Sequence, residues 1–109
     1  MKKIYRLKSN LQYKMVYKKG NVLSNKAFTL IFVRNNFNTA KFGFNISGKY
    51  GKAVKRNKLR RQLKAVCSEF AATTQAGFYV LRPRFYACDA PTFEVLKKSV
   101  KELFDRVDK

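Results

Sequence analysis

Apolar positions follow a helical period in three segments of the chain. In residues 10–19 they lie between Ser9 and Gly20, residue types that are typical of helix starts and ends. From Lys52 to about Ala72 they repeat at i, i+4, i+7 and i+11, which predicts a helix that buries one stripe. A third helix is predicted to start near Pro91. The three stripes are Leu11, Tyr13, Met15, Val16 and Tyr17; Leu59, Leu63, Val66 and Phe70; and Leu96, Val100, Leu103, Phe104 and Val107.

Strand patterns occupy the segments between these helices. Residues from Ala27 to Arg34 are rich in β-branched and aromatic side chains, and residues from Lys41 to Ser47 alternate between apolar and polar. The turn-prone cluster Arg34–Asn38 separates them, so they are predicted to form an antiparallel hairpin. Phe78–Leu81 is predicted to be a buried strand that Pro83 ends, because proline cannot donate to a ladder.

The predicted order is helix, strand, strand, helix, strand, helix. It favours a single domain over residues 1–109 with an α+β fold, a small sandwich in which helices pack on one face of a sheet. The other face, or a cleft at its edge, is then open for a ligand. With 109 residues, of which 46% are hydrophobic, the chain can close one core and is not a disordered basic tail.

Charge is distributed unevenly along the chain. The formal net charge is +19, and residues 1–68 hold 18 Lys and Arg and no carboxylate. Residues 69–109 hold 7 Lys and Arg against 6 Asp and Glu. The first two thirds are therefore expected to face a polyanion, and RNA or DNA phosphates are the obvious partner. An anionic membrane surface fits less well, because the basic segment is followed by the patterns of a packed domain.

Missing residue types limit the possible chemistry. The chain has no His, and its two cysteines, Cys67 and Cys88, cannot complete a usual four-ligand zinc site, so both are expected to be free thiols. A self-sufficient nuclease needs a general acid or base or metal-holding carboxylates beside the bound RNA, and the basic part offers none. No run approaches the roughly 20 apolar residues of a membrane span, so a cytoplasmic location without membrane attachment is expected.

The densest positive charge lies in the second predicted helix. At 100° per residue, Arg56, Arg60 and Lys64 form one row, and Asn57 and Arg61 form the row beside it. Arginine can hold a phosphate with two hydrogen bonds and can stack on bases, so these rows suit a folded RNA. A merely solvated face is the alternative. It is less favoured, since this segment holds no carboxylate for i, i+4 pairing.

Tyr13 and Tyr17 are four residues apart, on one face of the first helix. Packing in the core is the simpler interpretation of this spacing. The alternative is a platform on which single-stranded nucleotides stack. Spacing alone does not separate the two.

The segment from Gly51 to Arg61, Gly-Lys-Ala-Val-Lys-Arg-Asn-Lys-Leu-Arg-Arg, resembles the Arg-Asn-Arg centred helix of the bacterial ribonuclease P protein family. Leu7-Lys8 through Tyr17 is similar to the family's first helix with its two aromatic residues. Phe42-Gly43-Phe44 and Ser47-Gly48-Lys49 are similar to the strand and turn before the basic helix. The resemblance implies a mixed sheet with a left-handed βαβ crossover, whereas the residues alone favour the usual right-handed one.

The resemblance also implies a division of labour in the endonuclease that removes the 5′ leader of precursor tRNA. The catalytic centre and its Mg²⁺ ions belong to a large partner RNA, and the protein itself is not catalytic and needs no cofactor or obligate protein partner. Contacts to the catalytic RNA are implied for Lys52, Lys55, Arg56, Asn57, Lys58, Arg60, Arg61 and Lys64. Contacts to the 5′ leader are implied for Tyr13, Tyr17, Ser47, Lys49, Arg82 and Arg84.

The chain departs from the family pattern at two positions. Lys58 stands where the family often has Arg, which keeps the charge but loses the two-pronged contact, and Gly48 stands where a second basic residue often follows the serine. A small ribosomal or general RNA-binding protein is the leading alternative. Duplex DNA binding is disfavoured, because no turn-helix pair precedes the basic helix as in a major-groove reader.

We predict that sulfate or phosphate raises the thermal midpoint of the free protein. The excess positive charge of residues 1–68 repels itself, and bound anions relieve that repulsion. Thermal unfolding at constant ionic strength in sulfate and in chloride measures this. Equal midpoints would mean that the fold already tolerates its own charge.

Overall fold

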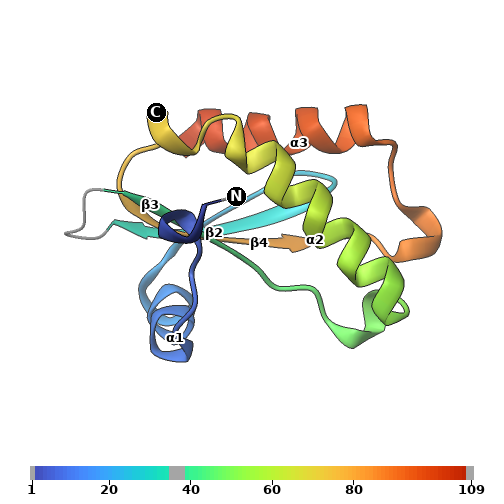
Figure 1. Cartoon of the computed structure of the whole chain (residues 1–109), viewed down its shortest axis with the longest axis horizontal. Helices are drawn as coiled ribbons and strands as arrows, with labels where there is room; N and C mark the ends of the chain where they lie inside the picture. Colours follow the sequence, from blue (N-terminus) through green and yellow to red (C-terminus); the bar gives the residue numbers. More distant parts are fainter. Residues whose placement is uncertain (1, 35–38, 108–109) are drawn as a thin grey trace.

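The computed structural model describes residues 2–34 and 39–107 (Figure 1). The helices and strands, in chain order, are α1 (Asn10–Lys19), β1 (Asn21–Ser24), β2 (Phe28–Arg34), β3 (Ala40–Phe44), α2 (Ala53–Ser68), β4 (Gly77–Pro83) and α3 (Phe93–Val107). Short 3-10 turns lie at Lys3–Tyr5, Gly48–Tyr50, Ala71–Thr73 and Ala87–Asp89. The α+β class predicted from the sequence is confirmed. The turn-prone residues Asn35–Asn38 lie outside the described residues.

The four strands form one mixed sheet in the order β1-β2-β4-β3. β4 pairs with β2 antiparallel, from Phe28 opposite Pro83 to Arg34 opposite Gly77, and with β3 parallel. The predicted hairpin of β2 with β3 is therefore wrong. Residues 77–81 of β4 are buried, so both faces of that strand need cover and both edges need a neighbour. β4 takes the central place for this reason.

The hairpin of this fold is instead formed by β1 and β2, which pair antiparallel from Asn21 opposite Phe32 to Ser24 opposite Thr29. β1 was not predicted. It has four residues, and only Leu23 among them is partly buried, so its sequence carries little alternation. A strand this short at the edge of a sheet leaves almost no pattern in the sequence.

Several element boundaries differ from the predicted ones. α2 ends at Ser68 rather than near Ala72, and the turn that follows places the Phe70 ring 4.9 Å from that of Phe104. α3 begins two residues after Pro91, because the Oγ1 of Thr92 accepts from the backbone N–H of Val95 and caps the helix. Packing of the Phe70 ring thus accompanies the end of α2, and the Thr92 cap fixes the start of α3.

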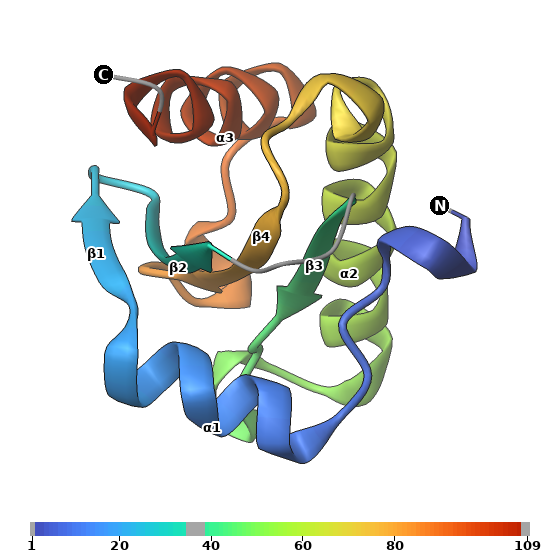
Figure 2. The ribbon, with the colours of Figure 1, turned by 90° about the vertical axis from the view of Figure 1, so that its left-hand side faces the viewer.

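The helices cover both faces of the sheet. α2 and α3 pack on one face, where their stripes meet Phe28, Leu30 and Phe42 in the main core. α1 packs on the opposite face through Val16, which lies with Leu7, Ile31, Phe78 and Val80 in a smaller core. Figure 2 shows α1 below the sheet and α3 above it. The expectation that the helices share one face therefore holds for α2 and α3 only.

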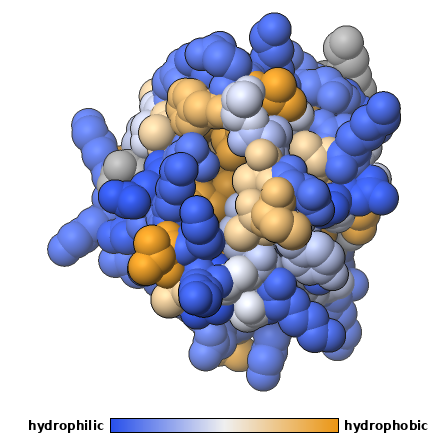
Figure 3. Space-filling model, turned by 90° about the vertical axis from the view of Figure 1, so that its right-hand side faces the viewer, coloured by the Kyte–Doolittle hydropathy of each residue, from blue (hydrophilic) through white to orange (hydrophobic). Residues whose placement is uncertain are grey.

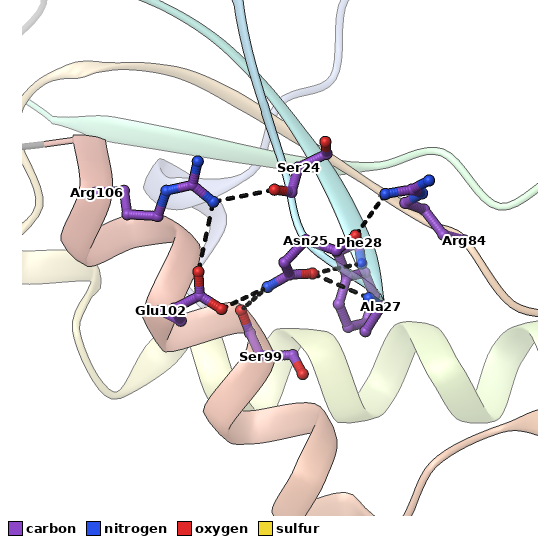
Figure 4. A network of polar contacts seen from close by, with 8 residues as sticks. All are labelled: Ser24, Asn25, Ala27, Phe28, Arg84, Ser99, Glu102 and Arg106. Atoms are coloured by element: carbon purple, nitrogen blue, oxygen red, sulfur yellow. Dashed lines mark hydrogen bonds and ion pairs between the residues drawn. The ribbon is translucent and has the colours of Figure 1, made fainter.

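Asn25, in the turn between β1 and β2, holds this hairpin to α3 (Figure 4). Its Oδ1 accepts from the backbone N–H groups of Ala27 and Phe28, and its Nδ2 donates to the Ser99 carbonyl and to Glu102. One side chain thus shapes the turn and ties it to a helix 74 residues later in the chain.

Substituting Asn25→Ala should lower the free energy of unfolding by about 2 kcal/mol, because it leaves two backbone donors and a helix carbonyl without this partner. Chemical denaturation of the two proteins measures the loss. Lys26→Ala, an exposed change in the same turn, should stay within about 0.5 kcal/mol of the parent. Equal effects of the two substitutions would contradict this role of Asn25.

Candidate nucleic-acid interface

A cleft opens between α1, β3 and α2 at the edge of the sheet that β3 forms. We call it the Tyr13 cleft; it encloses about 150 Å³. Its walls are Arg6, Leu7, Tyr13, Phe42, Gly43, Phe44, Arg60 and Lys64. The residues before α1 run beside β3, where the Leu7 N–H donates to the Phe42 carbonyl over 2.9 Å. This pairing brings Arg6 to the cations of α2.

Gly43 allows the Tyr13 ring to lie directly on β3. A Cβ at this position would come 2.4 Å from the Tyr13 hydroxyl oxygen, closer than real contacts allow. Burial raises the pKa of Tyr13, while a hydrogen bond from the Phe44 backbone and the charge of Arg60 act in the opposite direction. The phenol therefore stays protonated at neutral pH and keeps its hydrogen-bonding hydrogen.

Tyr17 is more open to solvent than Tyr13. Its side chain is 41% exposed, and its hydroxyl accepts a hydrogen bond from the Nδ2 of Asn45. Core packing, the simpler interpretation of the tyrosine spacing, thus fits Tyr13 in part and does not fit Tyr17. An exposed aromatic ring fixed by a hydrogen bond can accept a stacked base.

Three cations of α2, Arg56, Arg60 and Lys64, are half-buried. An Nη1 of Arg56 donates to the Gly51 carbonyl, and an Nη1 of Arg60 donates to the Asn57 side chain, both over 3.1 Å. Burial lowers the pKa of Lys64, and the charges of Arg6 and Arg60 lower it further. These cations repel one another, and a bound anion would relieve the repulsion.

The predicted RNA-binding residues of α2 do not share one face. Arg60 and Lys64 line the Tyr13 cleft, and Asn57 and Arg61 lie exposed along the outer side of the helix. Lys52 is the exposed residue before the helix. Arg56 is half-buried and donates to the Gly51 carbonyl. Lys55 and Lys58 line a different hollow on the far side of α2.

The predicted leader-binding residues outside α1 also separate into groups. Ser47 and Arg82 line one small hollow with Asn45 and Tyr86, next to Tyr17. The exposed Lys49 lies in the turn just after Ser47.

Arg84 lies elsewhere. Its Nη1 donates to the Asn25 carbonyl over 2.6 Å, in the network that ties the β1–β2 turn to α3. The structure therefore brings Ser47 and Arg82 toward the Tyr17 ring and engages Arg84 in holding the fold (Figure 4).

Sequence reasoning missed four residues of this surface: Arg6, Gly43, Asn45 and Tyr86. Arg6 is one of many cations in its region, and only the pairing of residues 6 and 7 with β3 brings it to α2. Asn45 and Tyr86 come from loops after strands, where no periodic pattern marks a position. Of the four, Gly43 alone had a signal, since a glycine inside a strand suggests close approach.

The ion pairs among the described residues lie on the α3 side of the molecule. Glu69 pairs with Lys97 and Lys101, and Glu102 pairs with Arg106. The cations of α1 and α2 thus form no ion pair within the described residues. Cys67 is buried and Cys88 is exposed, and both are free thiols, as predicted.

Residues 2–34 and 39–107 contain neither a metal-binding cluster nor a membrane-spanning helix. No three His, Cys, Asp or Glu side chains gather there in a way that could hold a metal ion. Nor does that part of the chain contain a helix of the length and apolarity that crossing a bilayer requires.

Comparison with known proteins identifies the family. The model of the family described as Ribonuclease P matches residues 1–108. The chain belongs to the ribonuclease P protein family. A relative from Symbiobacterium thermophilum, the ribonuclease P protein component, is 37% identical over 97% of this chain and 93% of its own. The ribonuclease P protein component of Bacillus pumilus is 35% identical over 95% of this chain and 88% of its own.

Solved structures of ribonuclease P proteins share the fold. A Staphylococcus aureus ribonuclease P protein mutant, described as defective in mRNA degradation activity, aligns with a TM-score of 0.89 at 25% identity. That alignment covers 97% of this chain and 90% of the mutant. The Thermotoga maritima protein aligns with a TM-score of 0.84 at 24% identity, over 93% of this chain and 96% of its own. The mixed sheet with α2 between parallel β3 and β4 is thus the fold of these ribonuclease P proteins.

Within this ribonuclease P family protein, Gly43→Ala should destabilise the fold by about 1–3 kcal/mol, because the new methyl group displaces the Tyr13 ring. Denaturant unfolding measures the change. Gly48→Ala is the matched control, since a Cβ there meets only an Arg56 nitrogen at 3.7 Å. If Tyr13→Ala does not reduce the cost of Gly43→Ala, the clash with the ring is not its cause.

Proposed function

We propose that this chain is the protein subunit of a ribonuclease P that removes the 5′ leader of precursor tRNA together with a catalytic RNA. The observation that carries the proposal is the Tyr13 cleft, in which half-buried cations and aromatic rings line one hollow open to solvent. Membership of the family supplies the class of reaction. The protein contributes binding, and the chemistry and most of the Mg²⁺ belong to the RNA.

The outer side of α2 is the proposed contact with the catalytic RNA. Asn57 and Arg61 are exposed there, and Arg56 and Arg60 flank them. An arginine fork matches a phosphate or the edge of a base, and a rigid helix presents these groups without reorganisation. Because each neutralised phosphate releases counterions, this contact should be strongly salt-dependent. The same neutralisation lowers the Mg²⁺ concentration that the folded RNA needs.

The 5′ leader is proposed to follow the Tyr13 cleft past Tyr17 toward Ser47 and Arg82. A single strand suits this path, since the exposed ring of Tyr17 can stack on a base and cations border it on both sides. Mature tRNA lacks these nucleotides. The cleft would therefore favour the precursor and let the product leave, which is differential binding used to select a substrate.

Tyr17→Ala should reduce the preference for precursor over mature tRNA by about tenfold, because stacking on one base contributes about 1–3 kcal/mol. The affinities of the reconstituted RNA–protein complex for both tRNAs measure the preference. Tyr17→Phe retains the ring, loses only the bond with Asn45, and should keep most of the preference.

Mature tRNA serves as the internal control, since its affinity should not change in either variant. Equal preference in the parent protein and in Tyr17→Ala would contradict the leader path. A parent protein that binds bacterial ribonuclease P RNA no better than ribosomal RNA would instead favour a general RNA-binding protein.

A further inference from the structure

A further hollow lies at the end of the molecule where α2 and α3 both finish. We call it the Asp105 pocket, and it encloses about 170 Å³ between α3 and the turn that follows α2. Figure 2 views the molecule from this end, with α3 and that turn side by side above the sheet. None of the residues that line the pocket belongs to the predicted RNA-binding set.

The floor of the Asp105 pocket is apolar. The rings of Phe70 and Phe104 lie with their centroids 4.9 Å apart at an interplanar angle of 51°, and Val107 lines the same hollow. Phe104 is 7% exposed and belongs to the main core, so the floor is held in place by the fold. An apolar cavity of about 150 Å³ can accept a molecule of the size of benzene. The pocket therefore has room for an aromatic ring or a short alkyl chain.

The rim of the pocket offers hydrogen-bond acceptors. The Oγ1 atoms of Thr73 and Thr74 donate to the Phe70 carbonyl over 3.1 Å and 2.8 Å. Each hydroxyl has a single hydrogen, so only its lone pairs remain for a ligand. Lys101, also in the rim, pairs over 3.5 Å with Glu69, which does not line the pocket.

The carboxylate of Asp105 is the charged acceptor of this rim. Within residues 2–34 and 39–107 it forms no ion pair or hydrogen bond. It lies in the last turns of α3, where backbone carbonyls lack helical partners and the helix dipole is negative. The aromatic rings of the floor also attract positive charge. These three features favour a cation in the pocket.

Charge distinguishes the Asp105 pocket from the Tyr13 cleft and from the hollows on either side of it. Among the described residues, those other hollows are bordered by lysine or arginine side chains and by no carboxylate. Figure 3 shows the face with the start of α2, where apolar patches lie among hydrophilic side chains. Lys55 and Lys58 border the hollow there and would repel an ammonium ion.

We propose that the Asp105 pocket binds a small organic ammonium ion, an amine whose apolar body lies on Phe70 and Phe104 and whose charged group donates to Asp105. The threonine hydroxyls of the rim are further acceptors for the same ammonium. This site is independent of the RNA-binding surface. A ligand in it contacts both the turn after α2 and the end of α3, and so stabilises the folded protein in proportion to its concentration.

The test measures binding of phenethylamine to the full-length protein by NMR chemical-shift titration at constant ionic strength. The dissociation constant should be on the order of 1 mM for a ligand of this size. Phenethyl alcohol has the same ring and chain without the charge, and should bind about tenfold more weakly, because hydrogen bonds to a charged donor are stronger. Methylammonium has the charge without the apolar body and should not saturate the site. The shifted signals should include those of Phe70 and Phe104.

Asp105→Asn tests the carboxylate, since it removes the charge and keeps the shape and an acceptor oxygen. The variant should bind phenethylamine about tenfold more weakly and phenethyl alcohol as the parent protein does, so that the preference for the amine disappears. Glu94→Gln is the matched control. It removes an exposed carboxylate from the first turn of the same helix and should keep the preference. Circular dichroism checks that both variants fold.

Three results would overturn the proposal. Equal affinity of the parent protein for the amine and the alcohol would mean that the pocket selects the apolar body alone. A preference for the amine that survives in Asp105→Asn, or that Glu94→Gln abolishes as well, would remove Asp105 from its assigned role. Absence of saturable phenethylamine binding at about ten times the expected dissociation constant would mean that the pocket is not an amine site.

Discussion

Burial of one stripe of α2 is the interaction on which the rest of this structure depends. Leu59, Leu63 and Val66 are almost fully buried against the sheet and α3, and each such side chain contributes about 1.5–3 kcal/mol. That apolar anchor holds the cations of the helix on a fixed scaffold despite their mutual repulsion. The rest of the helix surface lies outside the core. It presents cations to the Tyr13 cleft, to solvent on its outer side and to the hollow beside Lys55 and Lys58.

The charge distribution explains how the molecule divides its surface. Residues 1–68 contain no carboxylate, and the ion pairs of the described residues are confined to the α3 side. The α1 and α2 side is therefore poor in internal charge compensation. Repulsion between these positive charges lowers the stability of the free protein. It also favours the binding of polyanions, because a bound anion relieves the repulsion.

The sequence predicted the elements of this fold better than their arrangement. The stripes of α1, α2 and α3 are periodic and β4 is a continuous apolar run, so those elements were predicted with small errors at their ends. No local sequence pattern predicts the pairing of β3 with β4. The two strands pair because β4 is buried and needs a neighbouring strand on each edge. The position of α1 on the second face also depends on long-range packing, through Val16 against Ile31 and Val80.

For the candidate site, too, the sequence predicted the residues of one helix but not how distant segments come together around them. Helical spacing predicted the row of Arg56, Arg60 and Lys64, but it could not show that Lys55 and Lys58 face a second hollow. That hollow exists only because the Ala87–Asp89 turn returns to the start of α2. For Arg84, family resemblance suggested a leader contact, and the structure engages its side chain with the Asn25 carbonyl.

The central claim is that a partner RNA cleaves precursor tRNA and that this protein makes that cleavage efficient. The most direct measurement is cleavage of precursor tRNA at low Mg²⁺ by a bacterial ribonuclease P RNA with the protein, by the RNA without it, and by the protein alone. The account predicts cleavage at the mature 5′ end that requires the RNA and is strongly stimulated by the protein. Cleavage by the protein alone, or no stimulation of the RNA, would contradict it.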